Sequence, residues 1–291
     1  MTIGFIGIGN MGWPMAANIS KAGLPLKVFD LNSDRVQAFA GEVGATAASS
    51  LSEVGVGVQV IVNMLPTGAD VRDVLVGEGG LAPHLAEGTV VVDMSSSEPV
   101  GTRDLGVEFE ILGLSLIDAP VSGGVPGAEA GTLTIMIGGE DEVAIEKATP
   151  ALKAMGKNLF RTGPLGSGHA MKALNNYVAA AGFTAAAEAM LVGEKFGLDP
   201  AKMIDIINVS TGRNFNTESP IKEHVLTETY GTGFQLGLMT KDVRIAADLA
   251  DEMGVNSPMS ALARSFWAEA NDAEGEDQDF TYAFRHWDKR K

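Results

Sequence analysis

The stretch GFIGIGNMGWPMAANISKAG, residues 4 to 23, places glycines at Gly7, Gly9 and Gly12, directly after an apolar run and directly before a helical one. A nucleotide pyrophosphate explains this spacing. The first glycine permits a tight turn, the second lets the backbone approach the phosphates, and the third lets the helix pack closely on the strand. Free N–H groups and the dipole at the start of the helix favour the anion. A glycine-rich turn without a ligand is the alternative that the spacing leaves open.

An acidic residue ends the next strand-like run, because Asp30 stands 18 residues after Gly12. A carboxylate there can accept hydrogen bonds from the ribose hydroxyls and repels the additional 2′-phosphate of NADP. The sequence therefore predicts NAD as the cofactor, bound by the glycine turn with Asn10 and Met11 and by Asp30. Asp is also common in turns after strands, and the nearby Arg35 keeps NADP as the less favoured alternative.

Short apolar runs alternate with helical stretches up to about residue 163. Several of these runs, such as VVVD and VIVNML, are apolar at nearly every position, as expected when helices cover both faces of a parallel sheet. The alternation predicts an α/β fold, with an N-terminal Rossmann-type doubly wound sheet over residues 1–163. The predicted strands are Ile3 to Gly7, Leu26 to Asp30, Val58 to Leu65, Thr89 to Asp93, Leu116 to Ala119 and Leu133 to Ile137.

The pattern changes after a glycine-rich segment at 163–168, and no further strand is expected. An alanine-rich stretch from His169 to Phe196 predicts one long helix, and Asp199-Pro200 predicts the cap and first turn of the next. Residues 164–291 are therefore predicted to form an all-α C-terminal domain for substrate binding and oligomerisation. Further helices are expected over 239–253, over 257–271 and in the aromatic tail 280–287, with the acidic stretch 271–279 as a solvated loop.

The composition is that of a globular protein, with 45% hydrophobic residues, 20% charged residues and a formal net charge of −16. This acidity argues against a nucleic-acid partner, which requires a basic surface. The chain has no cysteine and its four histidines show no paired spacing, so no metal site is predicted. Neither a signal peptide nor an apolar run of membrane-spanning length is seen. We expect a cytoplasmic protein without a membrane partner, whose redox chemistry depends on a bound cofactor.

Three further stretches accompany the glycine turn: DAPVSGGVPGAEAGTLTIMIGG (118–139), GSGHAMKALNN (166–176) and LMTKDVRIAADLA (238–250). Together with GFIGIGNMG they resemble the β-hydroxyacid dehydrogenase family, which includes 3-hydroxyisobutyrate dehydrogenase, tartronate semialdehyde reductase and, more distantly, 6-phosphogluconate dehydrogenase. The resemblance covers nearly the whole chain and does not distinguish one member from another.

The resemblance assigns a substrate site to Ser122, Gly123 and Gly124. These residues offer a hydroxyl and two unobstructed N–H groups, and the family uses the matching stretch to hold the substrate carboxylate. A glycine turn without a ligand is the alternative. Ser96, after the fourth strand, stands where the family commonly has Thr, and the resemblance gives it a contact with substrate and cofactor through a shorter hydroxyl.

Lys172 and Asn176 lie four residues apart in the predicted long helix, and hence on one face of it. In the family the matching lysine is the general acid and base, and the matching asparagine positions it and the substrate. From the helix pattern alone, a lysine with an apolar stem and its amino group in water is the alternative.

The resemblance also extends the cofactor site. Leu65 and Pro66, which end the third strand, match a family stretch that lines the cofactor. Lys241 and Asp242 match a family pair whose lysine lies against the nicotinamide. A solvated ion pair on a helix surface is the alternative reading of that pair.

These assignments predict an oxidoreductase that transfers hydride between NAD and the hydroxyl carbon of a small β-hydroxy acid, with Lys172 taking the hydroxyl proton. 3-Hydroxyisobutyrate is the first substrate expected, because the loop at 122–124 lacks the neighbouring cation that a phosphate or sulfonate requires. Tartronate semialdehyde or a related short acid is the alternative substrate. A non-catalytic nucleotide-binding sensor on the same fold is the alternative of another class. We expect a homodimer or a homotetramer.

Overall fold

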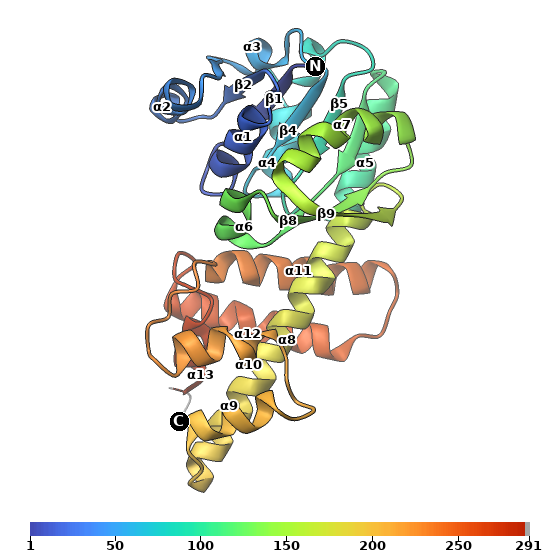
Figure 1. Cartoon of the computed structure of the whole chain (residues 1–291). Helices are drawn as coiled ribbons and strands as arrows, with labels where there is room; N and C mark the ends of the chain where they lie inside the picture. Colours follow the sequence, from blue (N-terminus) through green and yellow to red (C-terminus); the bar gives the residue numbers. More distant parts are fainter. Residues whose placement is uncertain (289–291) are drawn as a thin grey trace. The chain divides into compact units, whose positions relative to one another are not determined.

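The computed structural model describes residues 1–288. The chain divides into two compact units, Met1–Lys172 and a second unit that begins at Ala173. The first unit contains a nine-stranded, mostly parallel sheet with helices on both faces, and the second unit is helical (Figure 1). The predicted fold class, a Rossmann-type doubly wound sheet followed by an all-α region, is confirmed.

The sheet has the strand order β3-β2-β1-β4-β5-β6-β8-β7, and β9 pairs with β8. All six predicted strands are present, with ends within two residues of those expected. Strands β1, β2, β4, β5 and β6 run parallel, whereas β8 is antiparallel to β6 and β7 and parallel to β9. The predicted strands are β1 (Ile3–Ile6), β2 (Leu26–Phe29), β4 (Val60–Asn63), β5 (Val90–Asp93), β6 (Ser115–Asp118) and β8 (Leu133–Gly138).

Three strands are not predicted from the sequence. Two of them, β3 (Thr46–Ala47) and β7 (Val121–Ser122), are too short to show a periodicity. The third, β9 (Gly156–Gly163), is eight residues long but half exposed and largely polar, GKNLFRTG. An edge strand with water on one side lacks the apolar run that marks the buried strands of this sheet.

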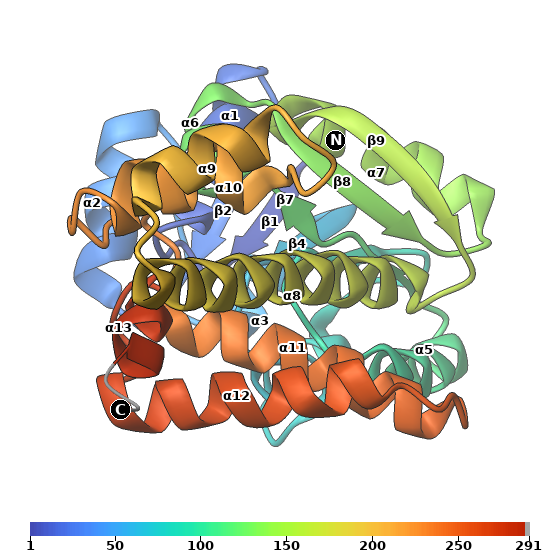
Figure 2. The same ribbon diagram turned by 90° about the horizontal axis from the view of Figure 1, so that it is seen from below.

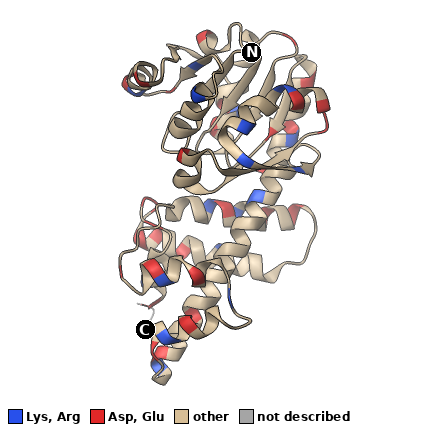
Figure 3. Cartoon of the chain, in the orientation of Figure 1, with Lys and Arg blue, Asp and Glu red and all other residues tan. Residues whose placement is uncertain are grey.

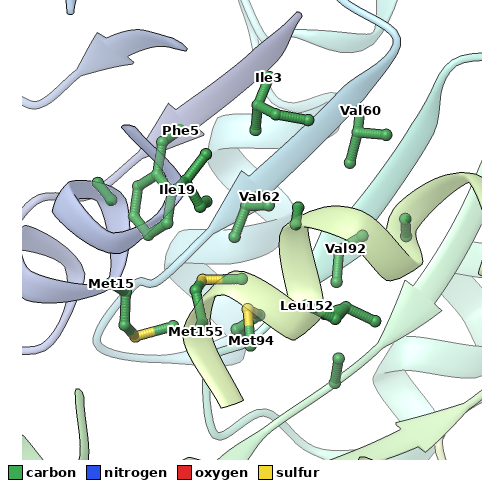
Figure 4. Packing of buried hydrophobic residues seen from close by; sticks show 14 of the residues in the cluster. Ile3, Phe5, Met15, Ile19, Val60, Val62, Val92, Met94, Leu152 and Met155 are labelled. Carbon is green, nitrogen blue, oxygen red and sulfur yellow. The ribbon is translucent and has the colours of Figure 1, made fainter. Parts of the chain in front are cut away.

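Successive residues of the central strands pack against opposite helical layers. Ile3 and Phe5 contact one buried cluster, which includes Met15 of α1 (Gly12–Lys21) and Leu152 of α7 (Glu142–Met155) (Figure 4). Ile6 belongs to a second cluster, on the other face. That cluster draws on α3 (Leu51–Gly55), α4 (Gly68–Val76) and α5 (Pro99–Ile111). The two-residue period of a strand explains why both faces are covered.

The remaining elements of the first unit connect these layers. They are α2 (Ser33–Val43), a short 3₁₀ helix at Ala82–His84 and α6 (Gly124–Ala130). The long helix α8 (Ser167–Phe196) begins in the first unit and continues in the second, as Figure 2 shows along its length. Its 30 residues span about 45 Å. It stops where Gly197 adopts a φ of +102°.

The second unit packs around an aromatic core. Phe183 of α8 contacts Phe280 at a ring distance of 5.2 Å, and Trp267 meets Trp287 edge to face at 5.6 Å. The aromatic tail therefore packs as predicted. The other elements are α9 (Pro200–Asn208), α10 (Phe215–Glu218), a π-helical turn at Ile221–Val225, α11 (Leu236–Glu252), α12 (Pro258–Glu274) and α13 (Tyr282–Asp288).

The acidic stretch 271–279 is only in part the solvated loop that was predicted. Its first residues complete α12, which ends at Glu274. Its last residue, Asp279, accepts hydrogen bonds from the Thr232 hydroxyl (2.7 Å) and from the Gly233 N–H (2.9 Å). The carboxylate therefore ties two segments of the helical unit together.

Basic and acidic residues are interspersed on the helices of both units (Figure 3). Among residues 1–288, none of the helices combines the length and the apolar character needed to cross a membrane.

Candidate active site

The three glycines of the first turn are needed for three different reasons. Gly7 has a φ of +87°, and a Cβ on Gly12 would stand 1.9 Å from the carbonyl oxygen of Gly7. At both positions the conformation or the close packing of the protein's own backbone therefore requires glycine. A Cβ on Gly9, in contrast, would meet nothing closer than the Arg35 guanidinium at 3.9 Å. The space beside Gly9 lies open, as a turn that receives a pyrophosphate requires.

The start of α1 suits an anion. Within the described residues, no side chain caps this helix, whose N-cap is Met11, and its first turn contains no acidic residue. The N–H groups at such a helix start are hydrogen-bond donors that favour negative charge. The glycine turn, Asn10 and Met11 therefore fit the pyrophosphate of a dinucleotide.

Asp30 lies at the end of β2 beside the glycine turn. Its carboxylate accepts hydrogen bonds from the N–H groups of Ile8 and Asn32, both at 2.9 Å. A carboxylate has about four acceptor positions, so two backbone bonds orient it and leave others for ribose hydroxyls. The next residue, Leu31, is 94% exposed. The geometry fits the ribose contact that the sequence predicts.

The ends of β4 and β5 are joined by buried hydrogen bonds. The Ser95 hydroxyl, fully buried, accepts a bond from the Leu65 N–H at 2.9 Å. This bond fixes the loop that contains Leu65 and Pro66 beside the glycine turn, since a Cβ on Gly7 would stand 2.9 Å from Leu65 Cδ2. Ser96 is half-buried, whereas its neighbours Ser95 and Ser97 are buried. Ser96 is thus the accessible hydroxyl of this run.

The loop Ser122-Gly123-Gly124 joins β7 to α6. Both glycines have positive φ, +133° and +60°, and both are exposed. Helix α6 packs on α1, and the Asn18 side-chain amide donates a 2.6 Å hydrogen bond to the Ala128 carbonyl oxygen. The packing brings the loop predicted for the carboxylate and the helix predicted for the pyrophosphate onto neighbouring elements.

Lys172 and Asn176 occupy successive turns of α8. Lys172 is the last residue of the first unit, and Asn176 lies in the second. Asn176 is buried, and its amide donates a 2.5 Å hydrogen bond to Asp242 Oδ2 while its oxygen accepts one from the Asn175 amide at 3.1 Å. The orientation of the Asn176 side chain is therefore fixed from both ends.

Asp242 is a residue of the candidate site that the sequence did not lead us to select. The reading of Lys241 and Asp242 as a solvated ion pair is wrong, since Asp242 is 2% exposed and the Lys241 side chain 14%. The Lys241 ammonium lies 3.9 Å from Asp242 Oδ1. A signal was present in the sequence, because Asp242 falls with Met239, Val243 and Ala246 on the apolar face of α11.

The described residues thus offer a glycine turn suited to a dinucleotide, a loop of two exposed glycines suited to a carboxylate, a lysine and an oriented amide. Within residues 1–288, no cluster of three or more His, Cys, Asp or Glu side chains is arranged to hold a metal ion.

Family models match nearly the whole chain. Residues 2–163 match the NAD binding domain of 6-phosphogluconate dehydrogenase. Residues 166–287 match the model described as NAD-binding of NADP-dependent 3-hydroxyisobutyrate dehydrogenase. The chain therefore binds NAD, and the second model leaves room for NADP.

Individual relatives align over most of their length. The NAD-dependent L-serine dehydrogenase of Pseudomonas aeruginosa is 39% identical over 271 residues, which cover 91% of this chain and 90% of the relative. The 3-hydroxyisobutyrate dehydrogenase of the same organism is 38% identical, with 96% of each chain covered. The solved structure of Mycobacterium tuberculosis 3-hydroxyisobutyrate dehydrogenase with L-serine has a TM-score of 0.89 and 32% identity, over 98% of both chains. The chain therefore belongs to the β-hydroxyacid dehydrogenase family of NAD(P)-dependent oxidoreductases, which act on small hydroxy acids.

Proposed function

We propose that this protein oxidises the primary hydroxyl of a short 3-hydroxy acid with NAD, and that 3-hydroxyisobutyrate is its substrate. The observation that supports the proposal most directly is the packing of α6 on α1. Through this contact, a loop with two exposed glycines lies on the element next to the glycine turn. A small carboxylate and a dinucleotide are the ligands that these two loops suit.

In the proposed reaction, the 122–124 loop holds the carboxylate and Asn176 orients the substrate, with Asp242 holding its amide in place. The amine of Lys172, in its neutral form, takes the hydroxyl proton, and the hydroxyl carbon becomes an aldehyde. Bound NAD supplies the hydride acceptor. Ser96 and Lys241 contact the bound ligands. Residues 1–163 serve as the cofactor domain and residues 164–291 as the domain for substrate and association.

L-Serine is the second candidate substrate. It shares the hydroxymethyl and carboxylate groups of 3-hydroxyisobutyrate and carries an ammonium where the other has a methyl. The relative named as an L-serine dehydrogenase and the solved structure that contains L-serine favour this candidate. The experiment that separates them is a measurement of kcat/KM with NAD for 3-hydroxyisobutyrate, L-serine and glycerate, with tartronate semialdehyde tested in the reductive direction. A higher value for L-serine overturns the choice of 3-hydroxyisobutyrate.

The helical unit is also proposed to form a homodimer or homotetramer. Large apolar side chains of α8 and its neighbours are exposed, including Val192 (70%), Phe196 (83%) and Val209 (86%). Surfaces of this kind mark association sites when they are contiguous. Sedimentation equilibrium tests the proposal, and a monomer at micromolar concentration contradicts it.

Lys172→Ala should lower kcat by at least about 10²-fold, because general acid and base groups contribute about 10² to 10⁴ in rate. NAD affinity, measured by calorimetry, should persist, since the cofactor turn lies on other elements. Asn176→Ala should also lower kcat, and the double variant should lose less than the product of the two single effects. Near-normal turnover by Lys172→Ala, on the best substrate found, means that Lys172 is not the base, and a sensor function then becomes the better explanation.

A further inference from the structure

A buried carboxylate that the proposed reaction does not use lies at the start of α8. Asp118, at the end of β6, is fully buried. Its Oδ1 accepts a 2.7 Å hydrogen bond from the Gly166 N–H, and its Oδ2 accepts a 2.8 Å bond from the His169 N–H. A capping side chain usually stands next to the helix it caps. Here the cap comes from a strand about 50 residues earlier in the chain.

Two glycines show how closely the chain is fitted around this carboxylate. A Cβ on Gly138, which pairs with Asp118 across the sheet, would stand 2.2 Å from Asp118 Oδ1. A Cβ on Gly168, in the first turn of α8, would stand 2.8 Å from Asp118 Oδ2. Neither position has a positive φ, so at both the demand for glycine comes from contact, including the contact with this carboxylate.

The His169 side chain attaches the same turn to a second helix. Its Nδ1 lies 2.9 Å from the hydroxyl of Thr102, on α5. The Thr102 hydroxyl donates its one proton to the Glu98 carbonyl oxygen at 3.0 Å. In its bond with His169 the Thr102 hydroxyl can therefore only accept, so His169 Nδ1 carries the hydrogen.

The other ring nitrogen of His169 faces a carboxylate. Nε2 lies 3.6 Å from Asp93 Oδ2 and makes no hydrogen bond within the described residues. Asp118 Oδ2 lies 3.9 Å from Nδ1. Asp93 is held by three bonds of its own, from the Asn63 amide, the Ser95 N–H and the Ser97 hydroxyl. The imidazole is thus enclosed by β5, β6 and α5.

The segment just before α8 is attached as well. The Arg103 guanidinium, on α5, donates a 3.0 Å hydrogen bond to the Leu165 carbonyl oxygen. The hydroxyls of Thr162, on β9, and Ser167 lie 2.7 Å apart. The first turn of α8 therefore has fixed contacts with strands and with a helix of the cofactor unit.

We propose that Asp118, His169 and Thr102, together the α8 anchor, are positioning residues that set the place of the Lys172 amino group. The inference rests on the proposed role of Lys172 as the base. Lys172 stands one helical turn after His169, so any shift or rotation of the first turn is passed to its side chain. A displacement of about 1 Å at a reacting group can cost about 10²-fold in rate. The anchor contributes to catalysis through Lys172 and touches neither substrate nor cofactor.

Thr102→Val tests the anchor without burying a new charge or changing the side-chain shape. It removes the acceptor of the His169 Nδ1 bond and should lower kcat about tenfold. Backbone amide exchange over residues 166–170 should become faster, which is a readout independent of turnover. Thr149→Val is the matched control, because the Thr149 hydroxyl also bonds to the carbonyl four residues earlier in its helix, at 2.7 Å. The control should change neither quantity.

His169→Leu provides a second variant if Thr102→Val folds poorly. It removes the imidazole and leaves Asp93 with its three donors. The backbone bonds between Asp118 and α8 are kept. It should lower kcat at least as much as Thr102→Val, while NAD binding measured by calorimetry stays within about twofold, because the glycine turn lies on another element.

Chemical rescue separates a positioning role from a general loss of structure. Propylamine contains the atoms that Lys172→Ala removes, so it should restore part of the turnover of that variant. The rescued rate should be the same with and without Thr102→Val, because a free amine is not held by α8. A rescued rate that falls by the same factor as kcat overturns the inference, since the anchor then acts on more than Lys172.

Two further results have distinct meanings. Unchanged kcat in both Thr102→Val and His169→Leu, with Lys172→Ala inactive, overturns the positioning role and leaves the proposed function intact. Near-normal turnover of Lys172→Ala alone contradicts the base assignment, and the positioning role fails with it.

Discussion

Helices α8 and α9 are both capped at their N-termini by an aspartate, but the two aspartates lie at different distances along the chain from the helix that they cap. Asp199 stands directly before α9, is exposed, and accepts a 2.7 Å hydrogen bond from the Lys202 N–H. Asp118 is buried in the sheet and reaches the start of α8 from β6. One cap is local and solvated, and the other is remote and enclosed.

The difference shows what each cap does for the molecule. A local cap satisfies N–H groups that water could also satisfy, so its contribution is about 1 kcal/mol. A remote, buried cap satisfies groups that water cannot reach and also fixes where the helix lies. The cap of α9 contributes stability, whereas the cap of α8 also fixes the position of a helix that contains Lys172 one turn further on. The cap that fixes the position of a helix is thus found on the helix that contains the proposed base.

The same substitution at both caps gives the largest contrast. Asp118→Asn should lower the free energy of unfolding by about 3 kcal/mol, because the amide NH₂ must face one of two buried N–H donors. Asp199→Asn should change it by less than about 0.5 kcal/mol, since Asn caps helices as well as Asp. Calorimetric unfolding of the two variants beside the wild type checks both values. Similar losses at the two positions contradict the distinction between them.

The sequence predicts the structure correctly where the deciding contacts are local. The glycine turn, the strand that precedes it and the Asp199-Pro200 start of α9 each depend on neighbours within a few residues, and each is found as predicted. Asp118 is the first residue of the DAPVSGG stretch, and nothing in that stretch indicates that it caps a helix. Its partners, Gly166 and His169, are about 50 residues away, and no propensity or spacing connects such positions.

Asp242 was overlooked for a related reason. An acid beside a lysine on a helix is usually a solvated pair, whereas Asp242 is buried and accepts a hydrogen bond from Asn176, on another helix. Strand β9 was missed because it is a polar edge strand, which pairs with β8 alone among the described strands. In all three cases the structure is determined by contacts with residues distant in the sequence, which the local segment does not reveal.

The carboxylate of Asp30, just before α2, is the one proposed to bind the ribose of the cofactor. Asp30 accepts two backbone bonds there, and Leu31 beside it is 94% exposed. The wild type should use NAD far better than NADP. Asp30→Ser combined with Leu31→Arg should shift the preference toward NADP by about 10- to 100-fold, because a repelling charge is replaced by one that binds phosphate. Ratios of kcat/KM for the two cofactors measure the change.

Leu31→Arg alone is the control for this prediction. It adds the cation but keeps the carboxylate, so its preference should lie between those of the wild type and the double variant. Equal use of NAD and NADP by the unmodified protein contradicts the role given to Asp30.

The start of α1 differs from those of α8 and α9, because no side chain of the described residues caps it. If its N–H groups are kept for the pyrophosphate, Gly9→Ala should raise the Kd for NAD about tenfold while the thermal midpoint changes little. The Cβ would meet only the Arg35 guanidinium, at 3.9 Å. Gly12→Ala should instead impair folding, since its Cβ would stand 1.9 Å from the Gly7 carbonyl oxygen. An unchanged Kd for the Gly9 variant means that the phosphates lie elsewhere.

The smallest effect is expected at Asp141, the local cap of α7. Hydrogen bonds from the Ala144 N–H, and then from the Ser115 hydroxyl, lower the pKa of this carboxyl below its ordinary value of 3.8. A lowered pKa means that the charged form stabilises the fold above the ordinary value, and that this contribution is lost as pH falls through the folded value. Asp141→Ala should therefore cost about 1 kcal/mol at neutral pH, and the difference from wild type should shrink in acid. Asp141→Asn keeps the cap without the charge, so its loss at neutral pH should be smaller, and this loss should shrink in acid by the same amount as that of Asp141→Ala, because both variants lack the titrating carboxyl. Thermal midpoints of the three proteins across an acidic pH series test this, and a loss in Asp141→Ala that is constant with pH would show that the charge of this local cap contributes nothing.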